Sequence, residues 1–406
     1  MLMLCCRRHK NNTHKKRING KNICTSAFFV LPLHGNMRQW QVRHIILAVV
    51  IGTLAVAPAS VYAQYVGGGT SVFSFMSLPV SSRLNALGGS NVSIRDGELS
   101  MAMCNPALLG ERTDKVLSLN FAYWMEGTMF GSVLYGHNFG RSKIEYHPDE
   151  PDKPNYFAVG VHYLDHGKMK YADEFGNLTG GTFTAKDILI DAIYARQLGP
   201  MFSVGVSIKP VYSIYETRTS FALGADVGGH FQLPDSTLQI GLTLQNIGWQ
   251  LKGYYSREDG TKREMLPLNL QLGISYRFKH APLRLSMTIH NMQQWKLGYE
   301  NTNIHRNSDG ELEENANVAW YDMMFRHTIF ALDIVPKSER FYLTLSYNHR
   351  RRAEMNLKDQ RSLAGFAIGG GVRIYKFRIG FAFSQHTKSN FTYQVGLSLD
   401  INSLLK

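Results

Sequence analysis

The amino-acid sequence predicts an all-β fold: a transmembrane antiparallel β-barrel of about fourteen strands, with an irregular and partly helical plug segment at its N-terminal side. Three observations predict it: strict alternation of apolar and polar residues, an even number of alternating stretches, and short connections that alternate with long ones. In residues 268–279, every second residue from Leu268 to Phe278 is apolar or aromatic, and the residues between are polar or glycine. Such a strand suits lipid on one face and a polar interior on the other.

The basic charge of the chain belongs to its first 63 residues. The chain has 406 residues and a net charge of +13, which on its own suggests nucleic-acid binding. Residues 1–63 hold nine Lys or Arg and no Asp or Glu, so the remainder carries 35 basic against 31 acidic residues. The charge therefore indicates a leader, and we expect no nucleic-acid partner.

Residues 1–63 are predicted to be a leader with a secretory signal peptide. The apolar run 45–57 follows basic residues and precedes Val61-Tyr-Ala63, which fits a small-x-small cleavage site. A membrane-spanning helix explains this run less well, because the run is short. Cleavage near Ala63 would send the chain to the outer membrane, and Met37 would start a signal of ordinary length.

Residues 64–115 are expected to form a plug-like segment. They do not alternate, and turn-forming pairs such as Gly88-Gly89 and Asn105-Pro106 interrupt them. We expect short helices around 81–87 and 106–110, inside the lumen of a barrel.

Residues 116–406 are expected to form the outer-membrane β-barrel. The predicted strands are 116–126, 129–139, 155–165, 186–198, 201–214, 218–232, 236–248, 267–279, 283–293, 326–335, 339–351, 361–374, 377–387 and 390–401. An even number lets the first and last strands pair antiparallel. Alternation alone does not show whether the apolar faces of the strands contact lipid or a second sheet. A soluble β-sandwich is therefore the alternative.

The connections between these strands supply a separate indication of the barrel. Several short connections follow even-numbered strands, and the longer connections, 166–185, 250–266, 294–325 and 352–360, follow odd-numbered strands. Short turns on one rim and long loops on the other are typical of periplasmic and external ends. The long, charged connection 140–154 follows the second strand and departs from this pattern.

No catalytic, cofactor-binding or metal site is predicted, and the chain is not expected to be an enzyme. Asp165-His166 and His290-Asn291 resemble parts of a catalytic triad, but no Gly-x-Ser-x-Gly elbow accompanies them. Adjacent residues of a strand also face opposite sides of the sheet.

Other residues that resemble calcium-binding, phosphate-binding or lipid-binding motifs also fit structural roles. The acidic stretch 307–314 matches only part of a calcium loop and fits a solvated external loop. Gly67–Gly69 and Gly369–Gly371 lack the Lys-Ser/Thr of a phosphate loop. Arg350–Arg352 suit either anionic lipid or water at the rim, and Cys104 suits a buried small side chain.

The segment 75–109 resembles the PorV/PorQ family of outer-membrane β-barrels, which is related to FadL-like transporters. The resemblance rests on Arg83 five residues before Gly88-Gly89, on Asp96-Gly97, and on Asn105-Pro106-Ala107. In physical terms, Asn105 suits a helix cap with Pro106 in the first turn. Arg83 is expected to pair with Asp96 or with a carboxylate of the lumen, which would fix the plug to the wall.

The resemblance implies a non-enzymatic component of the type IX protein secretion system of Bacteroidota. Such a component would anchor the cell-surface attachment complex that processes secreted cargo and links it to anionic lipopolysaccharide. The implied partners are a PorZ-like surface protein, the PorU sortase and the PorV barrel, together with outer-membrane lipid and lipopolysaccharide. The external loop 294–325 is the expected docking surface. The competing hypotheses are a FadL-like transporter of hydrophobic molecules and a general porin.

Overall fold

The computed structural model describes most of the chain after residue 70. The described residues are 71–124, 127–139, 154–173, 175–255, 263–295, 297, 305–306, 312–313, 319–355, 363–385 and 391–401. The expected leader and signal, the glycines 67–69 and most of the long connection 140–154 lie outside them. Within the described residues no helix is long and apolar enough to cross a membrane.

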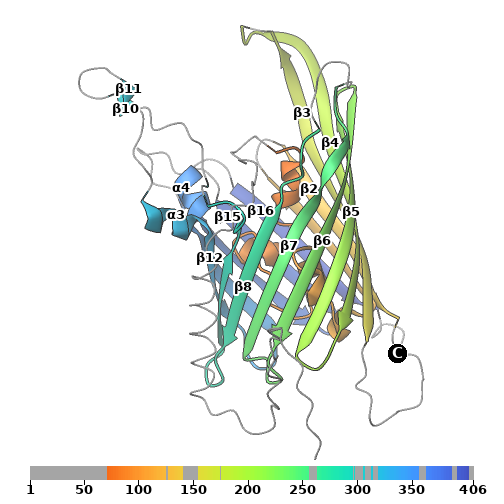
Figure 1. The fold of residues 1–406 in the computed structure, drawn as a ribbon, viewed down its shortest axis with the longest axis vertical. Coiled ribbons are helices and arrows are strands. Elements are labelled where there is room, and N and C mark those ends of the chain that lie inside the picture. Colours follow the sequence, from red (N-terminus) through yellow and green to blue (C-terminus); the bar gives the residue numbers. More distant parts are fainter. Residues whose placement is uncertain are drawn as a thin grey trace, which may run out of the picture. The chain divides into compact units, whose positions relative to one another are not determined.

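Fourteen antiparallel strands close into one barrel (Figure 1). The strands are β1 (Val116–Tyr123), β2 (Met129–Asn138), β3 (Asn155–Ala172), β4 (Leu178–Gln197), β5 (Phe202–Tyr215), β6 (Arg218–Gln232), β7 (Leu238–Lys252), β8 (Asn269–Arg277), β9 (Leu283–Ile289), β12 (Thr328–Ile334), β13 (Phe341–Asn348), β14 (Phe366–Ile374), β15 (Phe377–Gln385) and β16 (Phe391–Asp400). Each pairs with its neighbours in sequence, and β1 pairs with β16 from Val116↔Asp400 to Tyr123↔Tyr393. The fourteen-strand prediction is confirmed, and a two-sheet sandwich is excluded.

Three expected connections are wrong in detail. The predicted loop 166–185 is mostly strand, because β3 runs to Ala172 and β4 begins at Leu178. The predicted strand 339–351 ends at Asn348, and helix α4 (His349–Met355) follows it. A second helix, α3 (Trp320–Arg326), ends the connection 294–325, in which β10 (His305–Arg306) and β11 (Leu312–Glu313) form a separate pair. These segments lack a lipid-facing stripe, so the alternation rule does not detect them.

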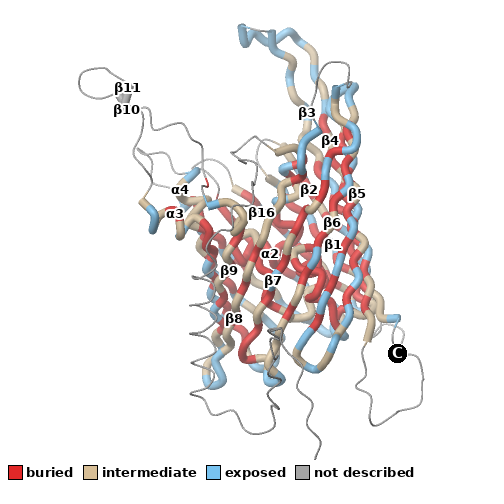
Figure 2. Tube along the Cα trace, viewed as in Figure 1, coloured by how far each residue is buried: buried red, intermediate tan, exposed pale blue. Residues whose placement is uncertain are grey.

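The wall alternates between buried polar and exposed apolar side chains, as the red and pale blue bands of Figure 2 show. In β1, Ser118 and Asn120 are buried, whereas Phe121 is 54% exposed. Val133 on β2 and Phe381 on β15 are exposed to a similar degree, at 50% and 48%. An apolar outer surface around the whole cylinder is stable only in lipid, because each exposed Å² of it costs about 25 cal/mol in water. The chain is therefore an outer-membrane type β-barrel.

The segment before β1 fills the lumen. It contains helix α2 (Ser82–Ala86) and the 3₁₀ turns η1 (Ser74–Ser77), η2 (Leu99–Met103), η3 (Pro106–Leu108) and η4 (Glu111–Thr113). We call residues 71–115 the plug. Helix α2 packs against β14 and β15, and η3 packs against β5 and β6.

Local sequence explains both plug helices near their predicted positions. The Oγ atom of Ser81 accepts a hydrogen bond from the amide of Leu84 at 3.2 Å and so caps α2. Gly88 and Gly89, with φ of 90° and 112°, end that helix in a conformation that suits glycine. The Oδ1 atom of Asn105 accepts from the amide of Ala107 at 3.1 Å, and Pro106 opens η3.

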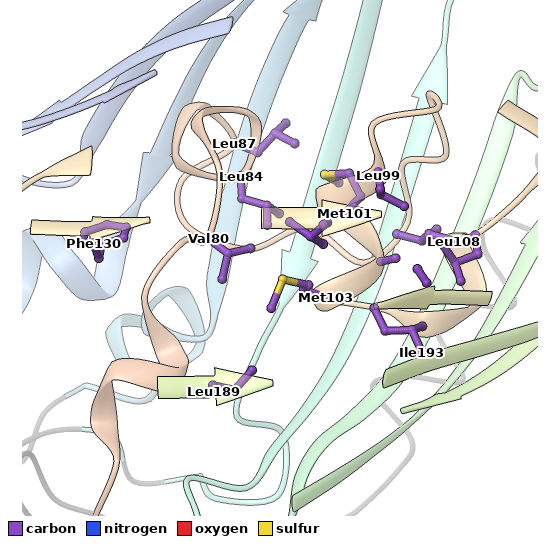
Figure 3. Close-up of a cluster of buried hydrophobic side chains, with 14 of the residues drawn as sticks. Val80, Leu84, Leu87, Leu99, Met101, Met103, Leu108, Phe130, Leu189 and Ile193 are labelled. Atoms are coloured by element: carbon purple, nitrogen blue, oxygen red, sulfur yellow. The ribbon is translucent and has the colours of Figure 1, made fainter. Parts of the chain in front are cut away.

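The apolar side chains of the plug form the core of the molecule (Figure 3). Leu84, Leu99 and Leu109 are completely buried. They belong to one cluster with wall residues such as Phe130 and Ile193. Burial of this kind stabilises the plug by roughly 1.5–3 kcal/mol for each large side chain.

Candidate functional site: the plugged lumen

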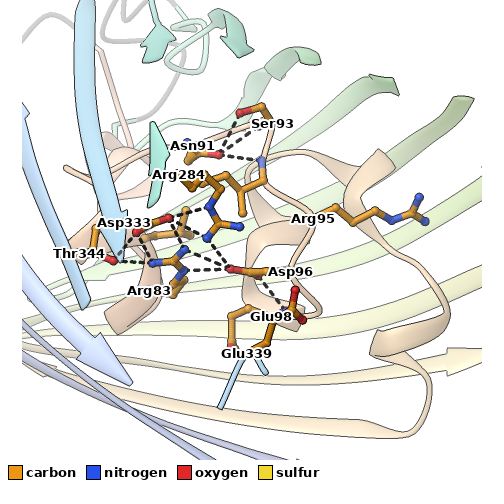
Figure 4. A network of polar contacts seen from close by, with 12 residues as sticks. Arg83, Asn91, Ser93, Arg95, Asp96, Glu98, Arg284, Asp333, Glu339 and Thr344 are labelled. Atoms are coloured by element: carbon orange, nitrogen blue, oxygen red, sulfur yellow. Dashed lines mark hydrogen bonds and ion pairs between the residues drawn. The ribbon is translucent and has the colours of Figure 1, made fainter. Parts of the chain in front are cut away.

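A buried arginine of the plug pairs with a buried aspartate of the wall. Arg83, at 1% exposure, donates from Nη1 to Asp333 Oδ1 at 3.1 Å and from Nη2 to Asp333 Oδ2 at 2.9 Å. It also donates to Thr344 Oγ1 at 2.7 Å and from Nε to Asp96 Oδ2 at 3.2 Å. The pairing expected from the sequence, with Asp96 or a lumen carboxylate, is confirmed for both partners (Figure 4).

A second arginine completes this group of charges. Arg284 of β9 lies between the same two carboxylates, with its Nη2 atom 2.7 Å from Asp333 and 3.4 Å from Asp96. The guanidinium of Arg83 also lies 4.3 Å from the centre of the Tyr342 ring. We call Arg83, Asp96, Arg284 and Asp333 the arginine cluster. It holds two cations and two anions, so its charges balance within the low-dielectric interior.

The electrostatics of Asp96 agree with a charged cluster. Burial alone would raise the pKa of this carboxyl group, but the neighbouring guanidinium groups of Arg83 and Arg284 hold it below its ordinary value. Asp96 is therefore ionised at neutral pH. Beside it, Arg378 of β15 donates to Glu98 of the plug at 3.2 Å, which adds a further link between plug and wall.

The opposite wall carries a second, unbalanced group of charges. Lys209 of β5 places its Nζ atom 2.5 Å from Asp226 Oδ2 and 3.8 Å from Asp191 Oδ2. Lys209 also donates to the carbonyl of Met103 in the plug at 3.4 Å. Within the described residues, neither oxygen of the fully buried Asp191 accepts a hydrogen bond of ordinary geometry. We call Lys209, Asp191 and Asp226 the lysine cluster; it holds two carboxylates against one ammonium.

On this side, side chains of the wall hold the plug mainly through hydrogen bonds to the backbone of the plug. Ser203 donates to the carbonyl of Ala107 at 2.8 Å, and the ring nitrogen Nε2 of His230 lies 2.9 Å from the carbonyl oxygen of Ser93. Asn105 of the plug donates in return to the carbonyl of Gly229 at 3.2 Å.

Two glycines of the wall allow this close approach. A Cβ atom at Gly241 would lie 1.7 Å from the carbonyl oxygen of Val92, and one at Gly228 would lie 2.0 Å from Asn105 Oδ1. Any larger residue at these positions would displace the plug.

Two cavities in the described part of the lumen are small or polar. An internal cavity of about 70 Å³ is lined by residues that include Met103, Cys104, His162 and Lys209. Small-molecule sites usually have about 300–1,000 Å³, and a water molecule takes about 30 Å³, so this cavity suits water. A pocket of about 390 Å³ opens at the rim of short turns and is lined by charged side chains such as Arg95 and Glu111. Neither is a continuous apolar channel.

An apolar groove lies on the outside of the wall. It has a volume of about 420 Å³ and crosses β16, β1, β2 and β3 at the outward-facing Gly131. Its sides are Phe121, Val133, Val161 and Val395. The groove therefore faces lipid and not the lumen.

The histidines considered from the sequence do not form a nucleophile and base pair. The Nε2 atom of His166 lies 2.7 Å from Asp187 Oδ2, not beside Asp165. Ser213 donates to the other oxygen of Asp187, so the carboxylate lies between hydroxyl and imidazole. In a serine triad the imidazole occupies that position. Sequence reasoning missed Asp187, because only the register of β3 against β4 brings it to His166.

The other candidate residues have separate positions. Arg350 pairs with Glu354 at 2.7 Å, whereas burial lowers the pKa of the neighbouring Arg351 to about 10. These arginines lie in helix α4 and not at the end of a strand, as the sequence suggested. In the described residues no group of three or more His, Cys, Asp or Glu is arranged to hold a metal ion. Most of the acidic stretch 307–314 lies outside the described residues.

Some solved structures are similar to this chain. No family model matches the chain, and no curated protein matches it. Among solved structures, it is similar to a TodX monoaromatic hydrocarbon channel mutant, with 12% identity, a TM-score of 0.47, and coverage of 79% of this chain and 97% of that one. It is also similar to the Ralstonia pickettii toluene transporter TbuX, with 13% identity, a TM-score of 0.42, and coverage of 79% and 96%. A third similar structure, the KdgM porin, has 10% identity and a TM-score of 0.24, with coverage of 70% and 98%.

Proposed function

We propose that this chain is a non-enzymatic membrane anchor for a protein assembly on the cell surface. The observation that carries the proposal is the buried pairing of Arg83 with Asp333, which ties the plug to the wall of the barrel. The plug occupies the lumen and is held there by balanced buried charges. Such a barrel suits the role of a fixed anchor. The small size of one lumen cavity and the charged lining of the other support the same function.

The resemblance of segment 75–109 narrows the proposal to PorQ in the PorV/PorQ family. In this proposal the chain belongs to the type IX secretion system and holds a PorZ-like surface protein, beside the PorU sortase and the PorV barrel. The complex would process secreted cargo and attach it to anionic lipopolysaccharide. The barrel itself contributes position, since it fixes external segments at the membrane surface.

Co-purification tests the anchor function directly. The full chain is extracted from outer membrane with a mild detergent, and the retained proteins are identified. We expect a surface protein to remain bound to the unaltered chain and to be released when residues 296–320 are deleted. A deletion of 141–152, a connection expected on the periplasmic rim, serves as the matched control. Retention of the surface protein by the 296–320 deletion would contradict the assignment of that loop, and its absence from the unaltered chain would contradict the anchor.

A second candidate function is the passage of hydrophobic molecules, as in FadL-like transporters. The apolar groove at Gly131 favours it, because the groove offers a binding surface at the membrane face of the wall. The monoaromatic hydrocarbon and toluene channels named above agree with this candidate more than with the anchor. Calorimetric titration of the purified chain with toluene separates the two functions: saturable binding supports passage, and no binding supports the anchor.

A further inference from the structure

One hairpin of the barrel extends far beyond the others. β3 has 18 residues and β4 has 20, whereas about 9–11 residues are enough to cross a bilayer as a tilted strand. β2 stops pairing with β3 at Asp165, and β5 stops pairing with β4 at Ala185. The hairpin beyond these points, residues 166–173 and 175–184, is called the ribbon. It rises roughly 20 Å past the last paired neighbour, at the rim of long loops (Figure 1).

The ribbon has two different faces. Met169, Tyr171 and Phe183 lie on one face and are half-buried against each other, with the Tyr171 and Phe183 rings 5.0 Å apart. Lys168 and Lys170 lie on the other face and are exposed. No acidic partner of either lysine is found in the described residues.

One edge of the ribbon is open to a new strand. The amide of Glu216 donates to the carbonyl of Thr184 at 3.1 Å, so the backbone of Thr184 faces β5. Thr184 is paired with Lys168, and in an antiparallel ladder the backbone of Lys168 must then face away from β4. The same holds for Lys170, two residues further on. Within the described residues, the β3 edge therefore presents free amide and carbonyl groups at both lysines.

The β4 edge is less accessible. The turn that contains Glu216 covers its base, and the hydroxyl of Tyr171 donates to Glu216 Oε1 at 2.5 Å. Gly180, with φ of 85°, interrupts the extended backbone of that edge. An incoming strand would therefore meet a regular ladder only on the β3 side.

We propose that the β3 edge of the ribbon is the docking site for an extended strand of a protein outside the outer membrane. The strand would add to the sheet through the amides and carbonyls of Lys168 and Lys170. Its side chains would alternate: acidic ones beside these lysines, and apolar ones beside Met169 and Tyr171. This proposal rests on the anchor function and names the element of the barrel that binds the partner.

Two proline variants test the role of the edge. Lys170→Pro removes an amide that points out of the β3 edge and leaves the β3–β4 hydrogen bonds in place. Thr182→Pro, opposite it, removes the equivalent amide on the β4 edge and is the matched control. The first probe is a fluorescent eight-residue peptide that alternates Glu with Val, titrated against the purified full chain. We expect Lys170→Pro and the double variant Lys168→Glu/Lys170→Glu to weaken binding about tenfold, and Thr182→Pro to leave it within about twofold.

Hydrogen exchange on the unaltered chain provides the second measurement. The amides of residues 166–172 are expected to exchange more slowly in gently solubilised membrane complex than in the purified barrel. Equal exchange in both samples, or equal peptide binding by Lys170→Pro and the unaltered chain, would overturn the docking site. If the chain still retains a surface protein in that case, the anchor function stands and only the ribbon assignment fails. If no surface protein is retained at all, the anchor function fails separately.

Discussion

The two sides of the barrel hold the plug by different means. Strands β9, β12 and β15 contact it through paired charges, with Arg83 and Asp333 at the centre. Strands β5, β6 and β7 contact it through single hydrogen bonds to its backbone and through glycines such as Gly241. Figure 4 shows the first side, where two arginines face two aspartates.

This difference indicates which side is the more permanent attachment. Separation at the arginine cluster would leave charges buried without partners, which costs several kcal/mol for each charge. Separation on the other side would expose hydrogen-bonding groups that water can satisfy at little net cost. We therefore expect any movement of the plug to begin beside β5–β7, with the arginine cluster as the fixed point.

The largest effect is expected from breaking the arginine cluster. Asp333→Ala leaves Arg83 and Arg284 with only Asp96, so the free energy of unfolding should fall by about 3–5 kcal/mol. Unfolding in guanidinium, followed by tryptophan fluorescence, measures it. Lys279→Gln is the control, because both Lys279 and its partner Asp235 are largely exposed, and such pairs are worth about 0–1 kcal/mol. If both variants lose the same free energy of unfolding, the arginine cluster stabilises the protein no more than an exposed ion pair does.

The glycine contacts should matter less than the charges. Gly241→Ala places a methyl group against the carbonyl of Val92, and we expect a loss of about 1–3 kcal/mol in the same unfolding assay. Gly229→Ala is the matched control, since no atom lies within 4 Å of the added Cβ and a change within about 0.5 kcal/mol is expected. If the two variants lose the same free energy of unfolding, the plug does not pack closely against β7 at Gly241.

Acid should weaken the side with paired charges. The folded pKa of Asp96 is depressed, so its contribution to stability is present above its ordinary pKa of about 3.9 and is lost as the pH falls through the folded value. The difference in unfolding midpoint between the unaltered chain and Asp96→Asn should therefore be constant from pH 8 to 5 and shrink below about pH 4. A difference that stays constant below pH 4 would contradict a charged Asp96.

The smallest effect is expected in the lysine cluster. Asp191→Asn removes the surplus carboxylate and leaves Lys209 paired with Asp226, so stability should change by less than about 1 kcal/mol or rise slightly. Asp226→Asn removes the closer partner and should cost more. Unfolding of both variants shows which carboxylate contributes more to stability. A larger loss for Asp191→Asn than for Asp226→Asn would mean that Asp191 is the main partner of Lys209.

The sequence was sufficient for the wall and for part of the plug. All fourteen strands follow from alternation, because lipid and lumen impose opposite polarity on successive residues. Arg83 was singled out with Asp96 as one of its partners, since both lie in one recognisable segment. Asp333 and Arg284 looked like ordinary inward-facing residues, and only barrel closure brings Asp333 to Arg83 across 250 positions.

Segments beyond the membrane were harder to predict. The alternation rule predicts a loop where the ribbon lies, because the faces of the ribbon are not divided between lipid and lumen and glycines 180 and 181 interrupt its pattern. Helices α3 and α4 have seven residues each, which is too short for a clear helical period. The contact between His166 and Asp187 is not predicted from the sequence, because it depends on the register of β3 against β4, which is irregular between Asp165 and Lys168.

The conductance of the chain in planar bilayers tests the central claim, a lumen closed by an attached plug. The account predicts no conductance steps for the intact chain and a stable open pore once residues 65–110 are removed. Steady conductance by the intact chain, or a barrel that stays closed without those residues, would contradict it.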